Sequence, residues 1–446
     1  MAARLKWDCS AVVFAEGESV VAEDEFGNVI RAGTAGADDA DVTQSAIDKA
    51  HPAGEVRIRR GRYCFDKPVV IYNSSTIRGE GRGTVIVPPS ADYAFKVMTT
   101  EDTELYRPFH GDPGPLYAVI LRDLAIDGER TDGRRQGKGI YMDTFWCSSF
   151  ENLWISNTGN ALYMRHVRES DFSNIHLIAN GDPEQAEASV IMTDENNNLH
   201  FRGLFVIYPN YIGLEMKPTS ASDTEIPEIP RLVFISQSMF HGWLREEGAA
   251  PYDLIRIADL DAHRVGMLAD VVIRDSRITV AGPGHASVNV INSPVTIANC
   301  VVTATEGKYV IRASEAARVR IVGNTFHSGN REGSKYALYT EDAEVIFKDN
   351  VLIGRNLAVR FAPASNSIVT DNRFILESEQ SSVWVGDDGR AGSCNIQIAG
   401  NIFSEKRAES AIGVSRLSTE DIQIRDNQFV GHYQKDPVIR ESSESS

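Results

Sequence analysis

Several short segments of this 446-residue chain carry polar and aromatic residues between regularly alternating apolar ones. In GIYMDT (139–144) and ALYMRH (161–166), the intervening residues are Tyr141, Asp143, Tyr163 and Arg165. Because successive side chains of a β-strand point to opposite sides, these residues face outward if the apolar ones form a core. Aromatic rings, carboxylates and cations on one surface suit the binding of sugar rings and their hydroxyls.

The same alternation continues along the chain and adds further outward positions. They are occupied by Glu215, Lys217, Arg256, Arg312 and Tyr339. Asp194 ends another such segment, and we expect it about one strand spacing, roughly 4.8 Å, from Glu215. Carboxylates about 5 Å apart suit a retaining glycosidase, and carboxylates about 6.5–9.5 Å apart suit an inverting one. Asp143 would lie about three strands from Glu215, which is too far for such a pair.

Elimination is the alternative reaction, and it requires a base and a positive charge beside a substrate carboxylate. The candidate bases are Lys217, Arg165, Tyr163 and Tyr211. Arg165, Arg256 and Lys217 could supply the charge without a metal. Calcium, bound by Asp143, Asp194 and Glu215, is the other source considered. No cofactor is firmly implied, and hydrolysis and elimination both remain open.

These considerations define a candidate site without an assigned metal ligand. The residues assigned to catalysis are Glu215, Lys217, Asp194, Arg165 and Arg256. The residues assigned to substrate binding are Tyr141, Asp143, Tyr163, His200, Tyr211, His241, Arg312 and Tyr339. His200 and His241 could also act as acid or base, although a lone histidine is more often structural.

The elements that must position these residues form a repeat. Its clearest copies are RIVGNTF (320–326), VIFKDNVL (345–352), SIVTDNRF (367–374), IQIAGNIF (396–403) and IQIRDNQF (422–429). Less regular copies begin at residue 120, and all of them alternate with the segments that carry the candidate site. Two strand families interleaved at a common period are what the stacked coils of a parallel β-helix require.

Two columns of identical residues support this alignment. Asn324, Asn350, Asn372, Asn401 and Asn427 share one position of the repeat. Each buried amide is expected to hydrogen-bond to the neighbouring coil, because an unpaired one would be costly. Met142, Met164, Met192 and Met216 share an inward position, which predicts a core stack rather than a metal site.

The N-terminal part is expected to close one end of the repeat. Apolar residues at helical spacing predict a short helix over 38–50, which would cover the first coil. We therefore divide the chain into an N-terminal segment with this capping helix (1–52), a β-helix (53–435) and a disordered tail (436–446). Long loops are expected at 101–117, 217–230 and 241–253, as cleft walls or subunit contacts.

Composition excludes several classes of protein. A formal charge of −17 argues against nucleic acid as a partner and would also repel a polyanion on average. No apolar run is long enough for a membrane span, and the first residues lack a signal peptide. The five cysteines are scattered and are expected to be reduced core residues. We expect a soluble protein that is extracellular or virion-associated.

The N-terminal region resembles that of the pectate-lyase-3 type. The matching motifs, in the order of that family, are GADD (36–39), SAIDKA (45–50), AGEVRIRRGRY (53–63) and GEGRGTVI (79–86). The resemblance implies the pectate-lyase-like right-handed parallel β-helix fold, in proteins that include polysaccharide lyases, glycoside hydrolases, epimerases and phage tailspikes. The catalytic motifs of pectate lyases, polygalacturonases and mannuronan epimerases are absent from this sequence, so none of their catalytic residues is carried over.

The sequence therefore predicts an all-β chain, a right-handed parallel β-helix of about 11–12 coils. Its predicted function is cleavage of a polysaccharide along the exposed face, by β-elimination or glycoside hydrolysis. The alternative is a non-catalytic glycan-binding protein similar to tailspikes or adhesins. A homotrimer is compatible with either function.

Overall fold

The computed structural model describes residues 6–51, 53–100, 116–129, 137–194, 196–218, 230–242, 252–258, 270–280, 286–304, 309–328, 335–362, 364–386, 393–415 and 420–440. In these ranges the chain is a parallel β-solenoid of about 11 turns with one short α-helix. The chain forms two compact units, one of residues 1–215 and 228–233 and the other of residues 216–227 and 234–446. The predicted long loops lie mostly outside the described residues.

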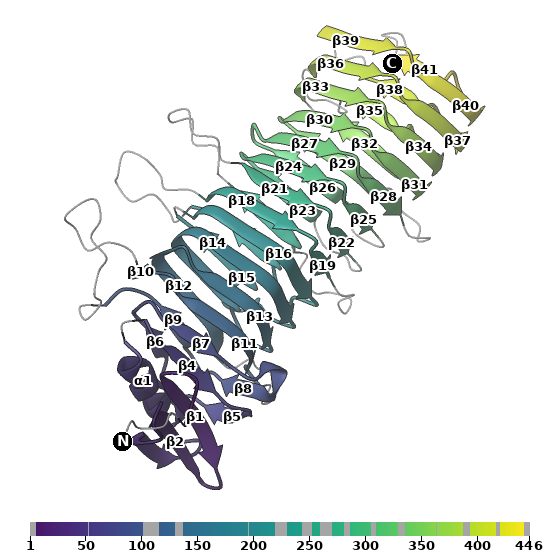
Figure 1. Ribbon diagram of the computed structural model, residues 1–446. Coiled ribbons are helices and arrows are strands. Elements are labelled where there is room, and N and C mark those ends of the chain that lie inside the picture. The colour runs from purple at the N-terminus through teal and green to yellow at the C-terminus, as the bar shows by residue number, and fades with distance from the viewer. Residues whose placement is uncertain are drawn as a thin grey trace, which may run out of the picture. The chain divides into compact units, whose positions relative to one another are not determined.

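The helix α1 spans Asp39–Lys49, close to its predicted bounds. Its apolar side is fully buried, with Val42, Ala46 and Ile47 inaccessible to solvent. It packs beside the first strands, as Figure 1 shows. Asp39 is also buried and accepts a hydrogen bond from the Cys64 N–H at 2.6 Å, which ties the start of the helix to the sheet.

An antiparallel meander that the sequence analysis did not predict precedes the helix. It consists of β1 (Ala11–Glu16), β2 (Ser19–Asp24) and β3 (Val29–Thr34). β1 also pairs in parallel with β4 (Glu55–Ile58), so the solenoid begins on this meander. The meander and α1 together cover the N-terminal end of the first unit.

The first unit contains two long rows of parallel strands and several shorter strands. One row consists of β6 (Val69–Ile71), β9 (Tyr93–Val97), β12 (Lys138–Trp146), the first part of β14 (Leu162–Ile178) and β15 (Val190–Thr193). A second consists of β4, β7 (Thr76–Arg78), β11 (Ile120–Asp127), β13 (Ser149–Ser156), the second part of β14 and β16 (Asn197–Ile207). The shorter strands are β5 (Gly61–Cys64), β8 (Thr84–Val87), β10 (Leu116–Tyr117) and β17 (Leu214–Met216).

The second unit repeats this plan more regularly. One row consists of β20 (Ile255–Ala258), β23 (Ala286–Ile291), β26 (Tyr309–Ser314), β29 (Lys335–Glu341), β32 (Leu357–Phe361), β35 (Val383–Val385), β38 (Ile412–Val414) and β41 (Val438–Arg440). The next consists of β21 (Val271–Arg274), β24 (Pro294–Ala298), β27 (Arg318–Val322), β30 (Glu344–Lys348), β33 (Ser365–Thr370), β36 (Cys394–Ala399) and β39 (Glu420–Arg425). The third consists of β19 (Met239–His241), β22 (Arg277–Val280), β25 (Val301–Ala304), β28 (Thr325–Ser328), β31 (Val351–Arg355), β34 (Arg373–Glu377), β37 (Ile402–Ala408) and β40 (Gln428–Tyr433). The remaining strand, β18, spans Arg231–Ser236.

A left-handed residue makes the same bend in coil after coil. In the second unit this position is held by Gln237, Asp275, Asn299, Gly323, Asp349, Asp371, Gly400 and Asp426, with φ between 51° and 68°. Glycine, asparagine and aspartate tolerate this conformation better than other residues do. The Asp-or-Gly position of the sequence repeat is therefore a requirement of the backbone at each corner.

The five aligned asparagines follow this bend and are hydrogen-bonded to one another. The Asn350 Nδ2 donates to Asn372 Oδ1 at 3.0 Å and to the Ile321 carbonyl at 2.9 Å, and the other rungs repeat the pattern. The Oδ1 of each of the last four also accepts the backbone N–H of the preceding asparagine, and Asn324 Oδ1 accepts the backbone N–H of Cys300. These bonds satisfy the polar groups that the corner would otherwise leave unpaired in the interior.

The inward residues stack in columns, as the alternation predicted. Met142, Met164 and Met192 are opposite one another in register and fully buried, and Met216 is fully buried as well. Phe150, Phe172 and Phe201 form a parallel ring stack with centroids 5.0 and 4.5 Å apart. The core is thus continuous along each unit.

The C-terminal boundary of the solenoid differs from the prediction. β41 pairs with β38, so ordered structure continues past residue 435 to Arg440, where a disordered tail was expected. Residues 441–446 of the predicted tail lie outside the described residues. In this extra rung Val438 is opposite the buried Ile412 and so continues the inward apolar column.

One interior position of the last coils is occupied by a charged residue and not by an apolar one. Glu405 is opposite Leu376 in the register and only 1% exposed. Burial raises the pKa of its carboxyl to about 7, and the Ser382 hydroxyl offsets this only in part. Neither oxygen of Glu405 has a hydrogen-bond partner of normal geometry among the described residues. The ionised form is therefore poorly stabilised in the folded protein.

Replacing an interior asparagine should destabilise the second unit. Asn372→Leu leaves the Asn350 amide without its acceptor and removes the bond to the Phe347 carbonyl, so we expect a loss of about 3 kcal/mol or more in the free energy of unfolding. Denaturant unfolding measures this loss. Asn427→Leu, at the half-buried last rung, is the matched control and should cost clearly less because water can replace its bonds. Equal losses would contradict the role of burial.

Glu405→Leu should remove a decrease in stability that the wild type shows as the pH rises. Since the folded pKa is about 7 and the ordinary value is 4.5, the wild type is most favoured below pH 4.5 and loses stability as the pH rises to about 7. The difference between these two pKa values corresponds to about 3 kcal/mol in the free energy of unfolding. The melting temperatures of wild type and variant should therefore diverge from acid to neutral pH. Glu409→Gln, an exposed carboxylate of the same region, should keep the wild-type pH dependence.

Candidate functional site

The outward residues of the first unit lie in rows across the strands. Tyr141 is opposite Tyr163, and Asp143 is opposite Arg165, on β12 and β14. Arg165 is in turn opposite Thr193 on β15. Residues that are 22 positions or more apart in sequence thereby become lateral neighbours on one surface.

A bend at the end of these strands brings a second carboxylate to the same place. Thr144, His166 and Asp194 occupy equivalent positions of three successive coils, and each has a left-handed backbone with φ of 52–54°. The chain turns at this point, so the side chain of Asp194 lies beside Arg165 of the preceding coil. The same bend places His166 next to Asp143.

The resulting cluster joins two carboxylates through one arginine. The Arg165 Nε lies 3.7 Å from Asp143 Oδ1 and 3.6 Å from Asp194 Oδ2. His166 Nδ1 lies 3.4 Å from the same oxygen of Asp143. The Arg165 side chain is 44% exposed, whereas both carboxylates are largely shielded, so the cluster can be reached from solvent on its cationic side.

The electrostatics of the cluster keep Asp143 ionised. Burial by itself raises the pKa of this carboxyl, but hydrogen bonds from His166 and Thr144 and the charge of Arg165 outweigh it, so the pKa lies below its usual value. Tyr141 donates a hydrogen bond to Asp143 Oδ2 at 3.3 Å. Burial and the charge of Asp143 raise the pKa of Tyr141 to about 12, so its phenol stays protonated. Asp143 can thus act as a base, a nucleophile or a hydrogen-bond acceptor.

The tyrosines of this surface stack on one another. The rings of Tyr141 and Tyr163 are nearly parallel, with centroids 5.3 Å apart, and Tyr93 adjoins Tyr141 at 5.5 Å. One face of the Tyr141 ring and one face of the Tyr163 ring therefore cover each other and are not available to a sugar ring. The hydroxyls of both tyrosines are hydrogen-bonding groups beside the cluster.

Glu215 differs from the exposed position that the alternation suggested. It lies on β17 between Leu214 and Met216, which are fully buried. Alternation would leave Glu215 exposed, yet it is only 4% exposed. Among the described residues, no three His, Cys, Asp or Glu side chains converge as metal ligands. The alternative of a calcium ion bound by Asp143, Asp194 and Glu215 is therefore not supported.

Other predicted residues of the first unit lie away from the cluster. His200 is opposite Asp171 on the row of β16, and its Nε2 lies 3.0 Å from Asn198 Oδ1. The backbone of Tyr211 lies beside Gly181, near the turn before β15.

The sequence did not point to His166, which directly follows Arg165. Only its place at the bend shows that it faces Asp143.

The remaining predicted residues belong to the second unit. They are Lys217, His241, Arg256, Arg312 and Tyr339. In register across its first row, Arg256 is opposite Asn289, Asn289 is opposite Arg312, and Arg312 is opposite Tyr339. Arg312 forms an ion pair with Glu341 at 3.1 Å, and burial lowers the pKa of His241. This outward row of polar and aromatic residues agrees with the predicted alternation.

The repeated coils and the outward polar rows define a class of protein. The family described as right-handed β-helix region matches residues 269–444. This match and the stacked parallel coils agree with the expected right-handed parallel β-helix fold. No curated protein matches the sequence. Among the described residues, no helix has the length and hydrophobicity that crossing a bilayer would need.

Solved structures of the same fold share little sequence with this chain. DFA-IIIase from Arthrobacter chlorophenolicus A6, solved without its lid in complex with GF2, is 14% identical with a TM-score of 0.50, over 88% of this chain and 96% of that one. PfbA, a surface adhesin of Streptococcus pneumoniae, is 13% identical with a TM-score of 0.47, over 92% and 91%. ORF18 of Geobacillus virus E2 is 14% identical with a TM-score of 0.47, over 77% of this chain and 59% of that one. At these identities the likeness concerns the fold alone.

Substitutions in the cluster should move the pKa of Asp143 upward. His166→Gly suits the left-handed backbone and removes the strongest interaction that lowers this pKa, so we expect a larger rise than with Arg165→Met. Carbon-detected NMR titration of the Asp143 carboxyl measures both shifts. Arg312→Met, in the second unit, is the control and should leave the titration unchanged. A larger effect of Arg165 would contradict this order.

Proposed function

We propose that this chain is a carbohydrate-active β-helix protein that binds a polysaccharide on the outer surface of β12, β14 and β15 and cleaves it at the cluster of Asp143, Arg165 and Asp194. The observation that carries the proposal is the placement of Arg165 between two carboxylates from neighbouring coils. Tyrosine hydroxyls beside this cluster supply hydrogen bonds to sugar hydroxyls. The homotrimer and the extracellular or virion location stay predictions.

The cluster favours hydrolysis over elimination. Elimination needs a cation that is free to neutralise a substrate carboxylate, whereas Arg165 already contacts two carboxylates of the protein. Both oxygens lie near one nitrogen, so the carboxylates are closer than the roughly 9.5 Å limit of inverting glycosidases. In the proposed reaction Asp143, which is ionised, acts as base or nucleophile, and Asp194 acts as acid.

A second candidate function is glycan binding without cleavage. In a two-carboxylate hydrolase one carboxylic acid must give up a proton, whereas in this cluster both carboxylates lie within 3.7 Å of the Arg165 guanidinium. A protein that only binds would use the same carboxylates and hydroxyls as acceptors and donors. The two functions predict different behaviour of the same variants.

Digestion of size-graded neutral and acidic polysaccharides tests the proposal. We expect new reducing ends without the ultraviolet absorbance of unsaturated uronates, because hydrolysis creates no double bond. Asp143→Asn and Asp194→Asn should each lower the rate about 100-fold or more while binding persists. Both rates and binding constants are measured on the folded variants.

Asp123→Asn is the matched control, since Asp123 lies on β11 outside the cluster and asparagine tolerates its left-handed backbone. It should leave both rate and binding unchanged. Unsaturated products would show that the reaction is elimination and not hydrolysis. Binding without products would favour the second candidate function. A wild type that binds no glycan of the panel would contradict both.

A further inference from the structure

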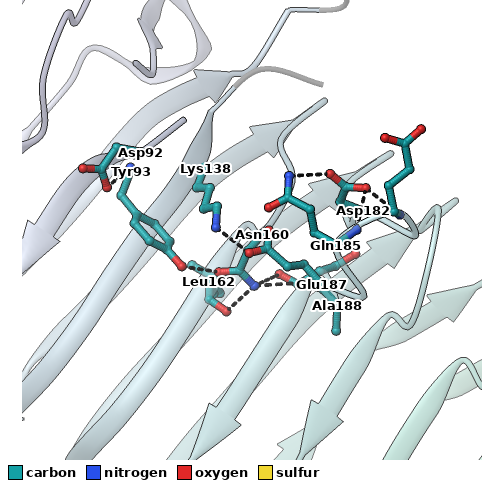
Figure 2. Close-up of polar contacts among 11 residues, drawn as sticks. Asp92, Tyr93, Lys138, Asn160, Leu162, Asp182, Gln185, Glu187 and Ala188 are labelled. Atoms are coloured by element: carbon teal, nitrogen blue, oxygen red, sulfur yellow. Dashed lines mark hydrogen bonds and ion pairs between the residues drawn. The ribbon is translucent and has the colours of Figure 1, made fainter. Parts of the chain in front are cut away.

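A second polar cluster lies at the opposite end of the same strands. Lys138, the first residue of β12, forms an ion pair with Glu187, and the two side chains are only 20% and 19% exposed. Figure 2 shows the Lys138 ammonium directed at the Glu187 carboxylate, with Tyr93 beside them. The Lys138 Nζ also lies 5.6 Å from the centroid of the Tyr93 ring, within reach of a cation–π interaction.

Tyr93 and Asn160 form the floor of this second cluster. The Tyr93 hydroxyl donates to Asn160 Oδ1 at 3.3 Å, and the fully buried Asn160 donates from Nδ2 to the Ala188 carbonyl at 2.8 Å (Figure 2). Burial and the charge of Glu187 raise the pKa of the Tyr93 phenol far above its ordinary value. The phenol therefore remains a hydrogen-bond donor at any physiological pH.

A closed turn holds Glu187 in place. Asp182 and Glu187 exchange two backbone hydrogen bonds of 2.8 Å, and the Asp182 carboxylate accepts the N–H of Glu184 inside the turn (Figure 2). Gly159 lies beneath, where an added Cβ would come within 3.3 Å of Glu187 Oε2. The carboxylate is thus positioned by a preorganised backbone on one side and by Lys138 on the other.

This ion pair has unused hydrogen-bonding capacity. Glu187 Oε2 is shielded from water and has no hydrogen-bond partner among the described residues. The Lys138 ammonium carries three donors, of which Glu187 Oε1 takes one. A buried acceptor without a partner is costly, so a ligand hydroxyl that displaces the atoms now covering Glu187 Oε2 would gain from bonding to it.

The chemistry of the pair points to one class of ligand. A sugar hydroxyl both donates and accepts, so two adjacent hydroxyls can bridge a carboxylate and an ammonium. A uronate carboxylate would meet the ammonium but would also be repelled by Glu187. The second cluster therefore suits a neutral sugar ring better than an acidic one.

The tyrosine row connects the two clusters. Tyr93 adjoins Tyr141, which donates to Asp143 of the first cluster. Along β12, Lys138 and Asp143 are separated by roughly 17 Å, at about 3.3 Å per residue. We propose that Lys138, Glu187 and Tyr93 form a distal subsite for a neutral sugar ring of the same glycan chain, which would then run along the strands past the tyrosine hydroxyls. This inference rests on the proposed function of the first cluster.

Calorimetry with oligosaccharides of increasing length tests the distal subsite. The probes are cello-, xylo- and fructo-oligosaccharides and oligogalacturonates, from disaccharides to octasaccharides, with the full chain. The double variant K138M/E187Q removes both charges together and so leaves no buried charge unpaired. We expect affinity for the longer neutral probes to fall about tenfold, with affinity for disaccharides unchanged. Tyr93→Phe should show the same dependence on length.

Lys435→Met is the control, because Lys435 forms a more exposed lysine–glutamate ion pair with Glu409 in the second unit. Thermal unfolding of each variant establishes that it is folded. An equal loss at all probe lengths, or no loss, overturns the subsite while Asp143→Asn still reports on the proposed function. Preferential loss of the oligogalacturonates would also overturn it, because it would show that the pair selects acidic sugars. Absence of binding by the wild type overturns both proposals.

Discussion

Parallel pairing of the strands in register fixes which residues of neighbouring coils meet. Each coil places its residues directly beside the equivalent residues of the next, so Asn350 contacts Asn372 across 22 positions of sequence. Polar groups at the corners are satisfied when the neighbouring coil presents a polar side chain at the same height, as Asn324 does for the N–H of Cys300. This requirement explains both the asparagine column and the recurring left-handed corner residue before it.

The same constraint builds the candidate site. Arg165 meets Asp143 because the two are opposite in the register, and it meets Asp194 because the chain bends at the equivalent position of the next coil. A surface made in this way is rigid, since each side chain is carried by a strand that is hydrogen-bonded on both sides. Rigid placement of carboxylates and hydroxyls is what binding of a sugar polymer, or its cleavage, demands.

The two polar clusters of the first unit differ in what they leave unsatisfied. In the first, Arg165 is shared between two carboxylates and remains exposed. In the second, Lys138 and Glu187 are shielded, and one carboxylate oxygen lacks a partner. The first cluster is therefore the better candidate for chemistry and the second for recognition. Glu405 shows the same cost in the core, where burial raises the pKa of its carboxyl to about 7 and no ligand is implied.

The fold, the inward methionine column and the rows of outward residues could be predicted from the sequence alone, because a parallel solenoid repeats one short pattern along the chain. The sequence also named five residues of the first site, Tyr141, Asp143, Tyr163, Arg165 and Asp194. The sequence did not predict that His166 faces Asp143, that the rings of Tyr141 and Tyr163 stack on each other, or that Glu215 is buried. These depend on corner geometry and on contacts between coils, which alternation along a single strand does not encode.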